Sequence, residues 1–292
     1  MLDKLKNIYP SLITYDQHLI HDKNYNWFTT NQNIIFGIHQ KELKAKDKQL
    51  LEMFFQTYNT SLPLETPTEK LWLERIRGNN ETQPKHPFRF IYFKLPNGQM
   101  SAVDFSEALH TLFDYKYPIL WENDIEGVII EEIPETSEAI DFEKIIDILM
   151  NDLSVNVRFF IGSLNEKSLS IQEIYERTIE TGSTILHLTD HHVMHYMESF
   201  PYLLLAQLSE DKRVELSKTV LHSFIEDQEM LETLHNYFYY NLNISETAKN
   251  MYMHRNSIQY RIDKFIKETN INIHHFNEAV SVKLAMLAKT LS

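Results

Sequence analysis

The chain of 292 residues is long enough for two or three domains of ordinary size, and its 43% hydrophobic and 24% charged residues are typical of folded globular proteins. It has no cysteine, which excludes disulfide scaffolds and thiolate metal sites. It also has no apolar run of the roughly 18 residues that span a membrane, and its N-terminus is charged where a signal peptide is apolar. These features predict a soluble cytoplasmic protein. The net charge of −13 argues against a surface that attracts nucleic acid everywhere.

The first 85 residues are predicted to form a small α/β module. Residues 26–28 and 34–38 are strand-like and flank a polar turn, which is typical of a β-hairpin. A helix over residues 41–58 carries leucine and phenylalanine at helical spacing, and a shorter helix is expected over residues 68–77. Turn-forming residues then mark a boundary, which we place after residue 85.

Residues 86–190 are predicted to form a second α/β domain. Its segments follow the order strand, helix, strand, strand, helix, strand, helix, at residues 88–93, 104–115, 119–121, 128–130, 141–153, 155–161 and 170–181. The second and third strands flank a turn at Asn123 and Asp124 and so form a hairpin. This order is the split βαβ plan of a ferredoxin-like core.

The C-terminal part differs from the rest in charge. Residues 191–226 read as a helical connector, and residues 227–292 as a separate module. From residue 229 onward the chain has seven basic and six acidic side chains, whereas the preceding residues have 21 and 35. Because an acidic body repels phosphates that a neutral module can approach, this asymmetry indicates a distinct C-terminal function.

The spacing of residues 230–267 predicts a helix-turn-helix. A helix over residues 230–240 is followed by a short helix that ends at Met251, for which Ser245 is the expected N-cap. After a turn at residues 252–254, a longer helix begins near Arg255. A helical bundle that binds no DNA would show the same spacing, so the spacing alone leaves both interpretations open.

The helix after the turn has two chemically different faces. A helical projection places Ile258, Ile262, Phe265 and Ile266 on one side, which we expect to be core. On the other side, Asn256 can bond both edge atoms of adenine, and Gln259 lies at the rim with similar chemistry. The cations expected to pair with phosphate or guanine are Arg255, Arg261 and Lys264.

Residues 243–249 (NISETAK) and 253–262 (MHRNSIQYRI) closely resemble the C-terminal helix-turn-helix of the PucR/CdaR family of bacterial transcription regulators, whose pattern is roughly N-x-S-x-T-A, a gap, and H-R-N-T-V-x-Y-R-L. Residues 230–238 (MLETLHNYF) and 269–273 (TNINI) match the flanking family patterns. The resemblance covers about 60 residues. It implies DNA binding, and the predicted DNA-binding residues are Ser245, Thr247, His254, Arg255, Asn256, Ser257, Gln259, Tyr260, Arg261 and Lys264.

Residues 88–185 look like the degenerate GGDEF-like domain that precedes this module in the same family. A diguanylate cyclase would carry paired glycines and carboxylates on the hairpin, whereas this hairpin reads WENDIEG at residues 121–127. Cyclase activity is therefore not expected. Glu122, Asp124 and Glu126 could gather a cation, although a charged hairpin tip is more often solvated.

The remaining motifs predict no cofactor and no metal site. His191 and His195 would lie one helical turn apart, a spacing that can bind zinc, but no further ligand accompanies them. Glycine-rich phosphate-binding motifs are absent, and the chain has only six glycines. Aromatic residues such as Trp27, Trp72 and Trp121 could line a ligand pocket, but they are more often core.

The predicted fold class is thus α+β and multidomain, with a small N-terminal α/β module, a ferredoxin-like (GGDEF-like) core and a C-terminal all-α helix-turn-helix. The predicted function is sequence-specific DNA binding by a non-enzymatic transcription regulator, as a homodimer on double-stranded DNA, with a small-molecule effector of unknown identity and no membrane partner. Two alternatives stay open: a nucleotide-binding or nucleotide-converting protein built on the GGDEF-like core, and a helical protein-interaction module.

Overall fold

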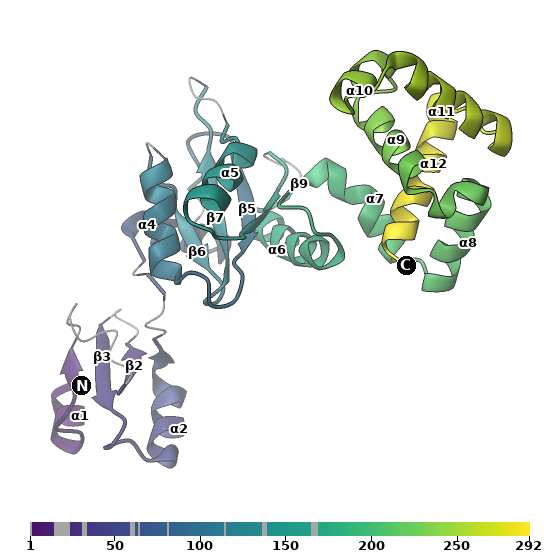
Figure 1. The fold of residues 1–292 in the computed structure, drawn as a ribbon. Helices are drawn as coiled ribbons and strands as arrows, with labels where there is room; N and C mark the ends of the chain where they lie inside the picture. The colour runs from purple at the N-terminus through teal and green to yellow at the C-terminus, as the bar shows by residue number, and fades with distance from the viewer. Residues whose placement is uncertain are drawn as a thin grey trace. The chain divides into compact units, whose positions relative to one another are not determined.

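The computed structural model describes residues 2–14, 24–30, 34–58, 62–63, 65–80, 82–113, 115–135, 139–164 and 169–292 (Figure 1). The chain divides into two compact units. The first unit comprises residues 1–159 and 164–179, and the second comprises residues 160–163 and 180–292. The fold is mixed α/β, with two sheets and a helical C-terminal region, as the sequence predicts.

The first sheet has four strands in the order β1-β3-β2-β4. Its elements are α1 (Leu2–Ile8), β1 (Ile13–Thr14), β2 (Tyr25–Thr29), β3 (Ile35–His39), α2 (Ala45–Phe54) and β4 (Gln56–Thr57). The predicted hairpin is confirmed in the antiparallel pairing of β2 with β3, while its turn at residues 31–33 lies outside the described residues. Trp27 pairs with Gly37, where a Cβ atom would lie 2.8 Å from the indole ring, so this position requires glycine.

The second sheet has five strands in the order β6-β7-β5-β8-β9. Along the chain the elements are α3 (Pro67–Ile76), β5 (Phe88–Lys94), α4 (Ala102–Leu112), β6 (Ile119–Trp121), β7 (Glu126–Glu132), α5 (Phe142–Asp152), β8 (Arg158–Ile161) and α6 (Ile171–Leu188). The predicted succession from β5 to α6 is confirmed. Both β5 and β6 pair antiparallel with β7, as a ferredoxin-like core requires.

Helix α3 contacts the second sheet. Trp72 is fully buried, and its ring centroid lies 5.1 Å from that of Phe88 on β5. The backbone N–H of Ile119 on β6 donates a hydrogen bond of 2.9 Å to Glu69 Oε1. A buried carboxylate and a buried indole therefore hold α3 against β5 and β6.

The second unit continues with β9 (Val193–His195), and its helical elements are α7 (Tyr196–Ala206), α8 (Glu210–Leu221), the 3₁₀ helix η1 (His222–Glu226), α9 (Gln228–Tyr239), α10 (Ile244–Asn250), α11 (Arg255–Thr269) and α12 (Phe276–Thr290). The prediction of a helical connector over residues 191–226 is wrong at β9. A three-residue strand has no periodicity of its own and forms because it pairs at the edge of a sheet. His195 consequently lies on a strand and not one helical turn from His191.

Helices α9 to α12 share one hydrophobic core. Fully buried members come from each of the three longer helices, with Leu234 on α9, Ile258 and Ile262 on α11, and Val282 on α12. Helix α10 contributes Ala248, whose small side chain permits close approach of the neighbouring helices. Among the described residues, no helix is both long and apolar enough to cross a membrane.

Candidate nucleic-acid interface

Helix α10 begins at a cap formed by Asn243. The Asn243 Oδ1 atom accepts hydrogen bonds from the backbone N–H groups of Ser245 at 3.0 Å and Glu246 at 3.2 Å. The predicted N-cap at Ser245 is therefore wrong by two residues. Asn241 and Leu242 adopt the left-handed backbone conformation, with φ of 52° and 61°, and this turn brings Asn243 to the start of the helix.

A short turn joins α10 to α11, and His254 caps the second helix. The His254 Nδ1 atom accepts a hydrogen bond of 3.2 Å from the Asn256 N–H. Within the turn, the Met253 N–H donates to the Ala248 carbonyl at 2.9 Å, which closes the end of α10. The helix-turn-helix spacing that the sequence predicts is thus present, with α11 starting at Arg255.

The inner face of α11 is the one that the helical projection predicts. Ile258, Ile262 and Phe265 are fully buried, and Ile266 packs against the same core as a partly buried residue. The outer face exposes Asn256, Tyr260 and other polar side chains to solvent. The helix therefore has a complete apolar seam and a polar surface that is free for contacts outside the domain.

The first turn of α11 differs in charge from the other helices around it. Residues 190–292 are described without a gap, and in this range α7, α8, α9, α10 and α12 each carry a carboxylate in the first turn, whereas α11 carries none. Its first residue is instead the exposed Arg255, and among the described residues no carboxylate pairs with it. A cation at a helix N-terminus opposes the helix dipole, so this position is electropositive.

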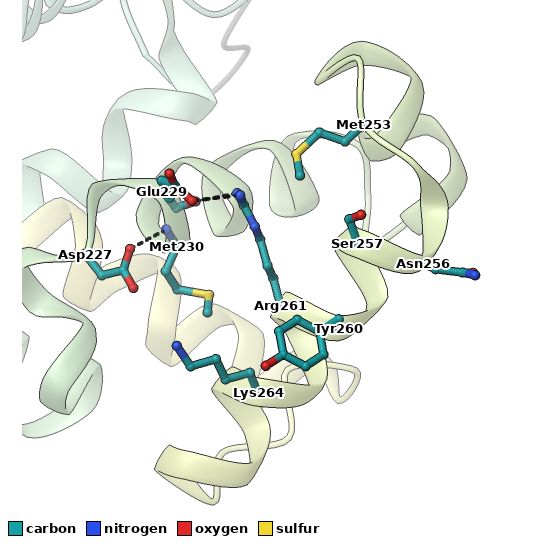
Figure 2. Close-up of a pocket in the computed structure, with 9 residues that line it drawn as sticks. All are labelled: Asp227, Glu229, Met230, Met253, Asn256, Ser257, Tyr260, Arg261 and Lys264. Atoms are coloured by element: carbon teal, nitrogen blue, oxygen red, sulfur yellow. Dashed lines mark hydrogen bonds and ion pairs between the residues drawn. The ribbon is translucent and has the colours of Figure 1, made fainter.

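Arg261 points inward along the domain surface, toward α9. Its Nη2 atom lies 2.8 Å from Glu229 Oε2, and its Nη1 atom donates hydrogen bonds to Thr233 Oγ1 at 2.9 Å and to the Glu229 carbonyl at 3.3 Å. Figure 2 shows this side chain extending toward Glu229, whereas Asn256 points away from the domain. Arg261 thus links the two helices, and its side chain is only 23% exposed.

A groove of about 520 Å³ lies between the start of α9 and the outer part of α11 (Figure 2). Asp227 and Glu229 line it from α9 and its cap, and Tyr260, Arg261 and Lys264 line it from α11. The half-buried Lys264 places its Nζ atom 5.5 Å from the centroid of the Phe224 ring, a cation–π distance. We call this the α9–α11 groove.

The other predicted residues divide into exposed and buried positions. Ser245, His254 and Tyr260 are exposed, while Ser257 and Gln259 are half-buried. The Gln259 Nε2 atom donates to Asp263 Oδ1 at 2.9 Å. Thr247 is fully buried, and its hydroxyl donates to the Asn243 carbonyl at 2.8 Å. Thr247 therefore has no surface with which to contact DNA and acts within the domain.

One exposed residue at this surface is missing from the predicted set. Tyr252 lies in the turn before α11 with 98% of its surface exposed, and its φ of 54° is in the left-handed region. A bulky residue held there is strained, and such strain concentrates at functional positions. Periodicity cannot identify Tyr252 because it belongs to neither helix, but a tyrosine in a tight turn where glycine is favoured is a sequence signal.

The carboxylates and histidines considered as metal ligands in the sequence make other contacts. Glu122 accepts a hydrogen bond of 2.5 Å from the Tyr175 hydroxyl, while Glu126 pairs with Lys94 at 2.6 Å. His191 contacts the Tyr202 hydroxyl at 3.1 Å. Within the described part of the chain, no three His, Asp or Glu side chains are arranged to hold a metal ion.

Comparison with known protein families decides what the C-terminal module is. Residues 230–288, which include α10, the turn and α11, match the PucR C-terminal helix-turn-helix domain. The module is a PucR-type helix-turn-helix domain. The resemblance that the sequence motifs indicated is thereby confirmed for this module, and a PucR-type domain indicates a DNA-binding transcription regulator. The likeness of residues 88–185 to a GGDEF-like domain stays a prediction.

Similar proteins extend beyond the PucR-type domain. The chain is 27% identical to the uncharacterized protein YxkF of Bacillus subtilis over 287 residues, which cover 96% of both chains. It is 22% identical over 290 residues to a leucine-rich protein of Streptococcus dysgalactiae subsp. equisimilis, covering 97% of this chain and 99% of that one. A solved structure of a regulator of polyketide synthase expression from Bifidobacterium adolescentis aligns with 76% of this chain and 91% of its own, at 15% identity and a TM-score of 0.33.

Proposed function

We propose that the chain is a cytoplasmic, sequence-specific transcription regulator whose helix α11 enters the major groove of double-stranded DNA. The first turn of α11 carries this proposal. It combines an Arg255 that has no partner among the described residues, an outward-pointing Asn256 and a first turn without a carboxylate, on the helix that a helix-turn-helix presents to DNA. We propose no enzymatic activity, since the matched PucR-type domain points to a regulatory DNA-binding protein.

The exposed residues have distinct proposed roles. Asn256 reads adenine through its amide, and Gln259 contacts a base edge through its carbonyl oxygen, since its Nε2 atom already donates to Asp263. Arg255 pairs with a phosphate or a guanine, and Lys264 and Tyr260 contact the DNA backbone from the edge of the α9–α11 groove. The rest of the surface contacts the DNA backbone through Ser245, Tyr252, His254 and Ser257.

Arg261 is proposed to act as a positioning residue for α11. Its guanidinium is already bonded to Glu229 and Thr233, so it fixes the angle between α9 and α11. Substitution of Arg261 would therefore disturb the fold and DNA binding together. Arg255 and Asn256 are exposed, and among the described residues their side chains have no hydrogen bond or ion pair, so their substitution tests DNA binding by itself.

A homodimer is proposed because one helix-turn-helix covers only a half-site of a few base pairs. Two copies on a palindromic or repeated operator would raise specific binding above the nonspecific background. The acidic remainder of the chain repels DNA, so we expect weak nonspecific binding and steep dependence on salt. A small-molecule effector remains part of the proposal.

Fluorescence anisotropy tests the proposal directly. The full chain is titrated against a pool of genomic fragments that includes its own upstream region, at about 50 and 150 mM salt. We expect selective binding that Arg255→Ala/Asn256→Ala lowers by about a hundredfold while the melting temperature stays unchanged. The control is Lys212→Ala/Asp211→Ala on α8, an exposed pair away from α11.

Two outcomes would contradict the proposal. Absence of selective binding at either salt concentration would favour the helical protein-interaction alternative for the C-terminal module. Equal affinity of the Arg255→Ala/Asn256→Ala variant and the unmodified chain would place the DNA contact elsewhere. Sedimentation of the DNA complex separately tests whether one or two copies bind an operator.

A further inference from the structure

A second groove lies within the C-terminal unit, between helices α9 and α12. It has a volume of about 490 Å³, which is within the range of small-molecule sites. Leu231 on α9 and Met286 on α12 give it apolar walls, while Gln228 and Thr290 add polar groups. None of these four residues lines the α9–α11 groove, so the two grooves are separate. We call this one the α9–α12 groove.

The titratable side chains of the α9–α12 groove are mostly basic. His235 lies on α9, and Lys283 and Lys289 lie on α12, with Glu232 as the single carboxylate in the lining. Lys289 already has partners, because its Nζ atom contacts the Ile225 carbonyl and lies 3.5 Å from Glu226 Oε2. Lys283 is half-buried, and among the described residues its ammonium has no ion-pair or hydrogen-bond partner.

The basic side chains of this groove influence one another's pKa values. Burial lowers the pKa of the Lys283 amine. The pKa of His235 is lowered first by burial and then by the charges of Lys283 and His191, while Glu232 opposes this effect. A partly desolvated cation without a partner is costly, and a bound anion would remove that cost. The groove therefore combines apolar walls with a lysine ammonium that has no partner among the described residues.

We propose that the α9–α12 groove binds a small organic carboxylate, with its charged group at Lys283 and His235 and its apolar body against Leu231 and Met286. The apolar walls favour an organic anion over inorganic phosphate, which has no apolar part. The volume favours a small molecule over a folded partner. This inference does not depend on DNA binding, and its test contains no DNA, so either proposal can fail without the other.

The test follows the methyl groups of methionine by NMR in the full chain labelled at [13C]methyl-Met. Acetate, butyrate, hexanoate and inorganic phosphate are titrated separately, and Met286→Leu assigns the Met286 signal. We expect a saturable shift of Met286, with Met253 in the α9–α11 groove as the internal control. Affinity should rise about fourfold for each methylene that becomes buried.

Substitution of the lysine supplies the decisive comparison. Lys283→Met should weaken hexanoate binding about tenfold or more, because it removes a charged hydrogen-bond donor but keeps the apolar stem. Lys212→Met, an exposed lysine on α8, should bind as the unmodified chain does. Since Lys283→Met removes an unpaired charge, its melting temperature should be unchanged or higher, which shows that it folds.

Three results would overturn the inference. The first is the absence of a saturable Met286 shift with any probe at roughly 20 mM. The second is binding of phosphate as tight as that of hexanoate, without any effect of chain length. The third is equal hexanoate affinity of the unmodified chain and the Lys283→Met variant.

Discussion

Arg261 on helix α11 contacts Glu229 on helix α9 twice, through the carboxylate at 2.8 Å and through the backbone carbonyl at 3.3 Å. A third bond, to Thr233 Oγ1, is 2.9 Å long, and Thr233 is fully buried. One guanidinium thus joins α11 to the helix that supports it. Removal of the Glu229 carboxylate leaves two of the three acceptors in place. Substitution of Glu229 should therefore reduce stability less than substitution of Arg261.

Arg261→Ala should lower the free energy of unfolding by roughly 1–2 kcal/mol, because it removes three hydrogen bonds. Glu229→Ala should cost less than about 0.5 kcal/mol, since that carboxylate is 79% exposed. Urea denaturation of both single variants and the double variant measures the two costs and their coupling. A larger effect of Glu229→Ala than of Arg261→Ala would contradict the assignment of Arg261 as the link between helices.

Glu229→Ala should also change DNA affinity, in the favourable direction. The substitution removes a negative charge from the α9–α11 groove beside the proposed DNA-binding surface. Affinity should rise severalfold at low salt, and the gain should shrink as salt screens the charge. Anisotropy at two salt concentrations measures this, with Glu232→Ala on the other groove as the matched control.

Tyr252→Gly separates folding from binding in the turn before α11. Glycine adopts a φ of 54° without strain, so the variant should lose no stability and could gain about 1 kcal/mol. Because Tyr252 is proposed to contact the DNA backbone, affinity should fall about tenfold with the loss of one hydrogen bond to a phosphate. The control is Tyr239→Ala, at an exposed tyrosine on α9. Unchanged affinity would remove Tyr252 from the proposed surface.

Asn243 and Ser245 offer a second matched pair. Asn243→Ala should destabilise the domain by about 1 kcal/mol, because the side chain accepts two backbone hydrogen bonds at the start of α10. Ser245→Ala should change stability by less than about 0.5 kcal/mol, since the exposed Ser245 side chain does not cap the helix. Thermal denaturation of both variants checks the order, and the reverse order would restore Ser245 as the cap.

The α9–α12 groove predicts a pH dependence of stability. Burial and the nearby Lys283 hold the pKa of His235 below its ordinary value of 6.5 in the folded chain. The unfolded chain therefore binds more protons as the pH falls below about 6.5, and stability is lost in that window. His235→Gln should lessen the fall in melting temperature between pH 7.5 and 5.5. If His235→Gln leaves the dependence of melting temperature on pH unchanged, other histidines cause that dependence.

The sequence predicts the elements whose pattern is long and regular. The apolar repeat of residues 255–267 identifies the core face of α11, since Ile258, Ile262 and Phe265 can be buried together on only one side of a helix. The alternation of strands and helices between β5 and α6 likewise predicts the ferredoxin-like order. These predictions succeed because local periodicity is enough to produce them.

Features that depend on a partner elsewhere in the chain cannot be predicted in this way. The link between Arg261 and Glu229 joins residues 32 positions apart and depends on how α9 packs against α11. Strand β9 forms through sheet pairing. The cap at Asn243 depends on two residues before it with left-handed backbone conformations. Neither is a glycine, from which the turn could be predicted. Burial of Thr247 depends on the same packing of helices.

The contacts of α11 also affect how easily the DNA sequence that it is proposed to bind could be changed. The residues that hold the helix in place, such as Ile258, Ile262 and Arg261, are different from those that face outward in its first turns. Arg255, Asn256 and Gln259 could therefore be randomised together in a selection library without loss of the fold. Such a library would turn this domain into a scaffold for new operator sequences, with one supporting framework and three interchangeable positions.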